Sequence, residues 1–311
     1  MLRRAIKAVA LLMLLAWTQP AGAAPRVVVT IKPLHGLVAE VMAGVGSPRM
    51  LVKGAASPHV YALKPSDIGE LNGADIFFRA SGATEPFSSK IAESLPPHVD
   101  VVTLQEAPGV VLLKRRAGAG FEPHADGHRH GHGSAKTKAF DGHIWLDPDN
   151  AKAMVDRIAY ALSAKDPANA GIFQANAAAL KHKLDALSAD LQRALHPLAG
   201  KPYVVAHDAF QYLERRFGLN VVGAISLSPD VAPSAKRLSE LRRKILSLGA
   251  ICVFAEPQAD KRLIENLTEG TLARTGTLDP EGFALEPGPN LYFTLMRKLA
   301  EDLRACLLAS T

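Results

Sequence analysis

The fold is decided by residues 166–197, which read DPANAGIFQANAAALKHKLDALSADLQRALHP. Asp166-Pro167 is typical of a helix cap followed by a first-turn proline, and the next proline comes only at Pro197. Between these points apolar side chains recur at steps of 4, 3, 4, 3, 4 and 4 residues, at Phe173, Ala177, Leu180, Leu184, Leu187, Leu191 and Leu195. This spacing predicts one long helix of roughly 45 Å.

Short β-branched runs lie on both sides of this helix and end in turn residues. Three precede it, at 27–31, 75–78 and 99–104, and three follow it, at 203–206, 221–225 and 251–255. Helical patterns separate these runs, which predicts an α/β fold of two (β/α) lobes with mostly parallel sheets joined by the long rigid helix. We expect an N-terminal lobe over residues 24–165, the linking helix over 166–197 and a C-terminal lobe over 198–311.

Residues 1–23 have the form of a secretory signal peptide. Arg3, Arg4 and Lys7 form a positive head, residues 8–17 are apolar, and Ala21-Gly22-Ala23 supplies the small residues of a cleavage site. The alternative is a membrane anchor, which needs about 20 apolar residues, whereas the run at 8–17 has only ten. We therefore expect a periplasmic protein with no membrane insertion after cleavage.

The charge and the cysteines fit an exported protein. The whole chain carries a net charge of +6, and removing the three basic residues of the leader leaves +3, which does not indicate a nucleic-acid partner. The two cysteines, Cys252 and Cys306, favour a disulfide because their number is even and the compartment is oxidising. That bond is worth about 4 kcal/mol on the chain-entropy model. The alternative is a pair of buried free thiols.

Three histidines lie in loops where a metal site can form. His207 directly follows the run 203–206, while His59 and His143 lie in loops of the first lobe. Ligands of open α/β sheets bind beyond the carboxyl ends of the strands, so the three imidazoles can meet in one cleft. Three neutral imidazoles with a carboxylate or water form the tetrahedral site that zinc prefers. The alternative is that each is an isolated loop residue, since no His-Glu-x-x-His motif is present.

Four motifs around these residues resemble one family. They are SPHVYALKPSD at 57–67, DGHIWLDP at 141–148, HDAF at 207–210 and LDP at 278–280. Together and in this order they resemble the cluster A-I substrate-binding proteins of metal ABC transporters, of the zinc-specific ZnuA type. The resemblance covers nearly the whole chain after the leader, including the cysteine pair and a histidine-containing loop. It implies two (β/α) lobes linked by a rigid helix, with the metal held between them.

The resemblance implies a ligand set. His59, His143 and His207 match the zinc-binding imidazoles, and Asp279 matches a position that supplies a fourth, carboxylate ligand in some members. In other members water takes that place, and Asp279 is then only the cap of an Asp-Pro turn. Manganese-binding relatives tend to have a carboxylate at the position of His207, and a mainly nitrogen ligand set also favours zinc chemically. Glu256, after the run 251–255, is a candidate acceptor for an imidazole N–H, with a structural salt bridge as the alternative.

Residues 114–142 form a polar loop that contains His124, His128, His130 and His132. In the zinc-specific type such a loop is thought to collect metal at lower affinity. Here it contains six basic and three acidic residues, so it attracts cations poorly. Weak auxiliary chelation by the four histidines and an inert solvated loop both remain open.

These observations predict a high-affinity zinc-binding protein of the periplasm that delivers Zn²⁺, its transported ligand, to the inner-membrane ABC permease of a zinc importer. We expect a monomer. The alternatives are a periplasmic zinc metalloenzyme, in which Asp279 is the base, and a manganese- or iron-type binding protein of the same family. Delivery of zinc to another protein and a role as an adhesin also remain open.

Overall fold

The computed structural model describes residues 23–54, 56–116, 140–227, 232–257 and 261–309. The N-terminal half contains β1 (Val27–Val29), α2 (Lys32–Val41), β2 (Arg49–Met50), α3 (Pro65–Asn72), β3 (Ile76–Arg79), α4 (Pro86–Ser94), β4 (Asp100–Thr103) and α5 (Pro148–Lys165). It is followed by α6 (Ala170–Leu195), β5 (Pro202–His207), α7 (Gln211–Phe217), β6 (Asn220–Ser226), α8 (Ala235–Leu248), β7 (Cys252–Ala255), α9 (Lys261–Thr268), β8 (Arg274–Thr277) and α10 (Leu291–Leu307). Residues 1–22 of the predicted leader and the four loop histidines, His124, His128, His130 and His132, lie outside the described residues.

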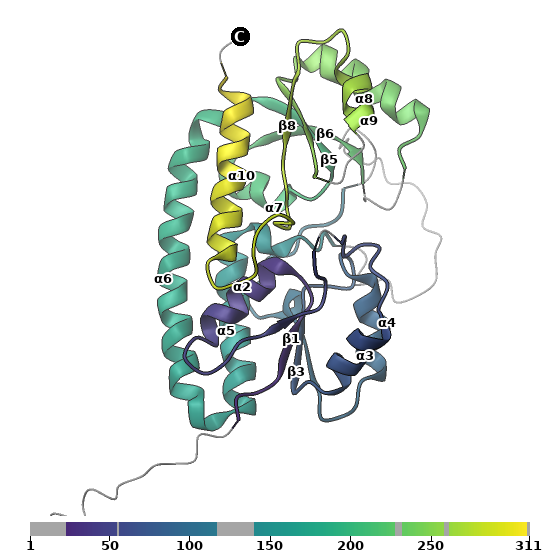
Figure 1. Ribbon diagram of the computed structural model, residues 1–311. Helices are drawn as coiled ribbons and strands as arrows, with labels where there is room; N and C mark the ends of the chain where they lie inside the picture. The colour runs from purple at the N-terminus through teal and green to yellow at the C-terminus, as the bar shows by residue number, and fades with distance from the viewer. Residues whose placement is uncertain (1–22, 55, 117–139, 228–231, 258–260, 310–311) are drawn as a thin grey trace, which may run out of the picture.

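The strands form two parallel four-stranded sheets, one in each lobe. The first has the order β2-β1-β3-β4 and the second β6-β5-β7-β8, and every neighbouring pair is parallel. The predicted fold of two α/β lobes is therefore confirmed (Figure 1). None of the helices in the described ranges combines the length and apolar character needed to cross a membrane.

Two edge strands were not predicted from the sequence. The first, β2, has only two residues, and β8 reads RTGT, which has no apolar run to mark it as a strand. Gly276 in β8 lies directly against the ring of Phe254 in β7, because a Cβ at this position would be 2.7 Å from a ring carbon. This close approach explains a glycine in the middle of the strand.

The linking helix α6 runs along one side of both lobes (Figure 1). All seven residues of its predicted apolar stripe are buried, and they face α2, α5 and α10. At about 1.5 Å per residue, its 26 residues form a spacer of roughly 39 Å. Its packing against elements of both lobes over this length makes it a stiff connection.

Further contacts join the lobes directly. The C-terminal helix α10 returns to pack against α2 of the first lobe. Trp145 Nε1 donates to the carbonyl of Pro280 at 2.8 Å, and Tyr292 in α10 donates from its hydroxyl to the carbonyl of Trp145 at 2.7 Å. Because these bonds are buried and cross from one lobe to the other, they oppose a wide opening of the cleft.

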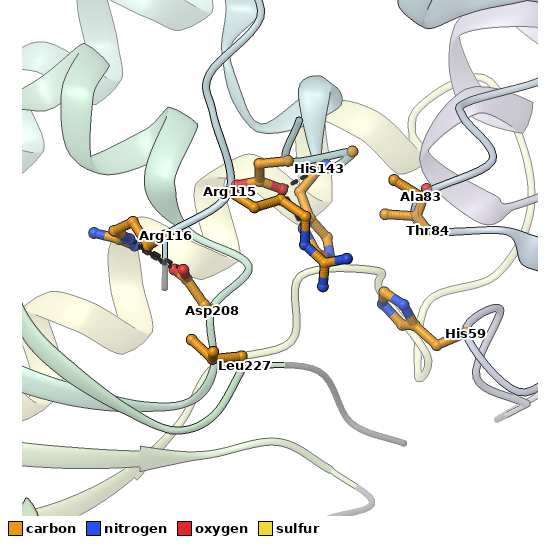
Figure 2. Close-up of a pocket in the computed structure, with 10 residues that line it drawn as sticks. His59, Ala83, Thr84, Arg115, Arg116, His143, Asp208 and Leu227 are labelled. Carbon is orange, nitrogen blue, oxygen red and sulfur yellow. Dashed lines mark hydrogen bonds and ion pairs between the residues drawn. The ribbon is translucent and has the colours of Figure 1, made fainter. Parts of the chain in front are cut away.

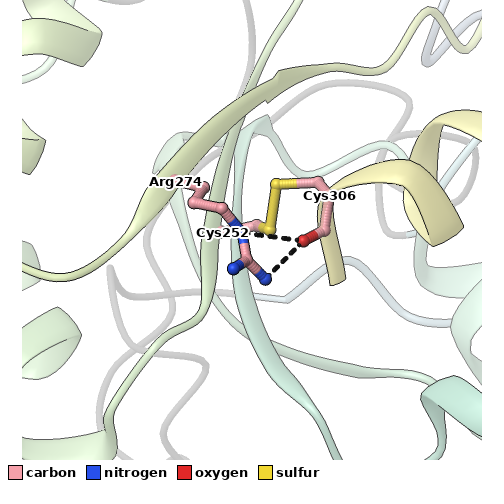
Figure 3. Close-up of a disulfide and its surroundings, with 3 residues drawn as sticks. All are labelled: Cys252, Arg274 and Cys306. Atoms are coloured by element: carbon pink, nitrogen blue, oxygen red, sulfur yellow. Dashed lines mark hydrogen bonds between the residues drawn. A yellow bond between two sulfur atoms is a disulfide. The ribbon is translucent and has the colours of Figure 1, made fainter. Parts of the chain in front are cut away.

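The predicted disulfide between Cys252 and Cys306 is present (Figure 3). It joins the first residue of β7 to the last turn of α10. Arg274 of β8 donates to the carbonyl of Cys306 from Nε at 3.0 Å and from Nη2 at 2.7 Å. The disulfide and this bifurcated contact hold α10 against the second sheet.

Candidate metal centre

The three predicted histidines come from three separate loops and converge between the lobes. His207 is the last residue of β5, His143 directly precedes a short 3₁₀ helix (Ile144–Leu146), and His59 lies in the loop between β2 and α3. His143 and His207 are buried, with exposed fractions of 5% and 3%, whereas His59 is half-buried. The site therefore has two fixed imidazoles in its floor and one nearer the surface.

The three imidazoles lie within the reach of a single ion. One nitrogen from each ring lies within 4.8 Å of a nitrogen of each other ring. The ring centroids are 5.2 to 5.5 Å apart, and the two Nε2 atoms of His143 and His207 are separated by 3.3 Å. Nitrogen ligands held tetrahedrally at about 2.05 Å from zinc lie roughly 3.3 Å apart. The two buried imidazoles are thus already at the spacing of zinc ligands.

Carboxylates on the far side of the rings determine which nitrogen faces the cleft. His143 Nδ1 donates to Asp141 Oδ1 at 2.7 Å, and His207 Nδ1 donates to Glu256 Oε1. Asp141 Oδ1 also accepts the backbone N–H of His143 at 3.0 Å. With the protons on Nδ1, the lone pairs of both Nε2 atoms point at each other, an arrangement that a cation between them stabilises. The contact of Glu256 is the kind of contact that we expected from its position after the strand.

The surroundings set the protonation of the two buried rings. Burial, together with the neighbouring His207, lowers the pKa of His143 well below its ordinary value. Burial also acts to lower the pKa of His207, but the attraction of the Glu256 carboxylate outweighs it and raises this pKa. His143 is therefore neutral and ready to bind metal near neutral pH, and His207 is the ring at which protons compete with metal.

Asp279 does not join the three imidazoles. Its Oδ1 accepts the backbone N–H groups of Glu281 at 3.1 Å and Gly282 at 2.8 Å, and its Oδ2 accepts that of Phe283 at 2.6 Å. Within the described residues, the group placed to hold a metal contains His59, His143 and His207 alone. The sequence left Asp279 open as a fourth ligand or as the cap of an Asp-Pro turn; its carboxylate makes the contacts of a turn cap, with Gly282 at φ 72° in the turn.

Arg116, the last described residue before 117–139, is bound to the second lobe, and sequence reasoning missed this role. Its Nε lies 3.1 Å from both oxygens of Asp208, and its Nη1 and Nη2 donate to Glu214 in α7 at 2.7 and 2.8 Å. Burial raises the pKa of Glu214 to about 7, although Arg116 opposes this shift. No sequence signal indicates this network, because its members lie about a hundred residues apart.

Tyr212 of α7 contacts the described chain on both sides of residues 117–139. Its hydroxyl donates to the carbonyl of Asp141 at 2.7 Å and accepts the N–H of Leu113 at 3.1 Å. Asp141 itself was detectable in the sequence, because an aspartate two residues before a histidine commonly bonds to the backbone of its own turn. The described residues on both sides of 117–139 are therefore anchored beside the metal-facing rings.

A small pocket opens from the imidazoles toward the surface (Figure 2). His59, His143, Thr84, Arg115 and Asp208 are among the residues that line it. The space in it that is open to a water-sized molecule is about 20 Å³. This is room for about one water molecule.

Two lobes held by a stiff helix, with an open three-imidazole site between them, define a substrate-binding protein for a metal cation. The family model described as "ZnuA: Zinc-uptake complex component A periplasmic" matches residues 27–306, and the chain belongs to this family. This membership confirms the family that the motifs indicated, and with it the expectation of a periplasmic transport component rather than an enzyme.

Two zinc-uptake relatives and one solved domain match over nearly their whole length. The high-affinity zinc uptake system protein ZnuA of Brucella abortus (strain 2308) is 42% identical over 310 residues, which covers 92% of this chain and 93% of the relative. The protein of the same name from Paracoccus denitrificans (strain Pd 1222) is 35% identical, with 91% and 92% covered. The Zn(II)-bound ZnuA-like domain of Streptococcus pneumoniae AdcA superposes with a TM-score of 0.70 at 26% identity, over 91% of this chain and 98% of that domain.

Proposed function

We propose that this protein binds one Zn²⁺ in the periplasm through the imidazoles of His59, His143 and His207 and delivers it to an ABC permease of the inner membrane. The observation that carries the proposal is the pair of Nε2 atoms 3.3 Å apart, each on a ring whose Nδ1 contacts a carboxylate. Zinc relatives that match more than nine-tenths of the chain support the choice of metal. All three imidazoles come from one chain, so a monomer is sufficient for binding.

The lobes hold still while the His59 loop closes on the metal. The stiff helix α6 and the bond from Trp145 to Pro280 oppose hinge motion, so the chain divides at 24–165, 166–197 and 198–311 without a flexible joint. Because His59 is half-buried and lies on a loop, it is the ligand that moves, both on capture and on release to the permease. Water completes the coordination in place of Asp279, and the four loop histidines supply only weak auxiliary binding.

The test is a zinc titration of the mature protein in competition with a chromophoric chelator. Wild-type protein takes up one tightly bound equivalent, and deletion of residues 120–138 leaves this equivalent in place. His143→Ala lowers the affinity by more than about hundredfold, since loss of a ligand exceeds the 10–100-fold that outer contacts contribute. His182→Ala, an exposed histidine on α6, is the matched control. Full affinity in His143→Ala would refute the proposal.

A further inference from the structure

The loop that carries His59 is attached to the first lobe at both ends. On the side of β2, the N–H of Val52 donates to the carbonyl of Thr30 at 2.9 Å. On the side of α3, Tyr61 donates from its hydroxyl to Oδ2 of Asp67 at 2.8 Å. The described residues between these two points belong to no helix or strand. The second attachment lies closer to the imidazole, since Tyr61 is two residues from His59.

Tyr61 is held from two directions. Its ring packs against the ring of Phe87 in α4, with the centroids 5.2 Å apart and the planes at 62°. Its partner Asp67 is buried in the first turn of α3, and the same Oδ2 accepts the backbone N–H of Lys64 at 2.8 Å. Hydrogen bonds to a carboxylate are about twice as strong as those between neutral groups. Tyr61 is therefore a firm attachment for this end of the loop.

The attachment at Tyr61 limits how far His59 can move. Two residues of extended chain span at most about 7 Å, so the imidazole stays close to the other two rings even when the loop opens. Without this attachment, the next one along the chain is Leu63, which packs against the buried cluster that contains Leu71 and Phe77. Four residues of extended chain span about 14 Å, so the imidazole could then reach much further from the site.

We propose that Tyr61 is a positioning residue for zinc, because it keeps the imidazole of His59 within reach of an ion bound by the other two imidazoles. This inference rests on the proposed function and adds to it a residue that does not touch the metal. Its contacts with Asp67 and Phe87 preorganise the loop, so less ordering is needed when zinc binds. A tether of four residues in place of two lowers the effective concentration of the third ligand about threefold. Ordering one more loop residue on binding raises the loss to about tenfold.

Tyr61→Ala tests the proposal in the zinc titration against a chromophoric chelator. This variant is expected to bind one equivalent of zinc with an affinity about three- to tenfold below that of wild type. Tyr61→Phe keeps the ring contact with Phe87 and loses the hydrogen bond, so its affinity is expected to lie between the two. Tyr160→Ala, at an exposed tyrosine on α5, is the matched control and leaves the affinity unchanged.

A double-mutant cycle with His59→Ala separates positioning from a general effect on the fold. With His59 replaced there is no third imidazole to position, so adding Tyr61→Ala is expected to have no further effect on zinc affinity. The same loss in both backgrounds, or no loss in Tyr61→Ala alone, overturns the positioning role and leaves the zinc site in place. Wild-type protein that fails to bind zinc, or His59→Ala that binds it as tightly as wild type, overturns the proposed function as well.

Discussion

Replacing Asp141 by asparagine measures what the carboxylate behind His143 contributes to zinc binding. The amide oxygen of asparagine can accept the same two N–H groups that Asp141 Oδ1 accepts at 2.7 and 3.0 Å, so the substitution removes the charge and keeps the shape. An imidazole bound to zinc through Nε2 places that oxygen roughly 6 Å from the ion. The variant therefore isolates an electrostatic effect at a known distance.

The expected loss of zinc affinity is about hundredfold. Coulomb's law with an effective dielectric constant of about 20 gives roughly 5 kcal/mol for a carboxylate and a dication at about 6 Å. This is an upper bound, because the dipole of the asparagine oxygen retains part of the attraction. Substitutions of groups that bond to a ligating imidazole typically cost 10–100-fold in metal affinity, and the burial of this pair places it at the upper end.

The assay is the chelator competition at pH 8 and at pH 6. Burial raises the pKa of Asp141 to about 7, so the carboxylate is charged at pH 8 and protonated at pH 6 in the metal-free protein. The difference between wild type and Asp141→Asn is therefore expected to shrink at pH 6. Asp156→Asn, at an exposed carboxylate paired with Lys181, is the control and changes nothing. A twofold or smaller effect of Asp141→Asn at pH 8 would refute the role of the carboxylate.

Three further predictions concern stability, measured by urea unfolding. Arg116→Gln leaves two buried carboxylates without their partner, so it lowers the free energy of unfolding by about 3–5 kcal/mol at pH 8. Arg116→Lys recovers part of this loss. A loss below about 1 kcal/mol in Arg116→Gln contradicts the prediction. Burial raises the pKa of Glu85 to about 7, so the folded state holds its proton more tightly and stability falls by roughly 3 kcal/mol as pH rises from about 4.5 to 7. Glu85→Gln removes that slope, and an unchanged slope would show that other groups cause it. Serine at both Cys252 and Cys306 costs about 4 kcal/mol, and a reductant then has no further effect; stability equal to wild type argues against the disulfide's contribution.

The sequence predicted the framework of the fold because its signals are periodic and local. The stripe from Phe173 to Leu195 could be read without tertiary information, and all of its members are buried. The edge strand β8 could not be predicted in this way, since the residues RTGT become a strand only through pairing with β7 and contact with Phe254. Tertiary pairing therefore decides those elements whose own side chains carry little apolar surface.

The histidines of the site were predictable, but most of their supporting contacts were not. His207 ends a strand, and the motifs around His59 and His143 point to the same family. The role of Arg116 depends on the meeting of segments from both lobes, so no local pattern marks it. Supporting residues are harder to predict than ligands because their partners are distant in the chain.

Asp279 shows why one motif can support two opposite roles. An Asp-Pro turn ending in glycine offers backbone N–H groups to the carboxylate, and the same carboxylate is a competent zinc ligand. Any movement of Asp279 that breaks its three hydrogen bonds costs about 1.5–3 kcal/mol for each bond, since each is made to a charged group. A water molecule can fill the fourth position without this cost. The competition between these hydrogen bonds and the metal therefore decides which of the two roles Asp279 takes.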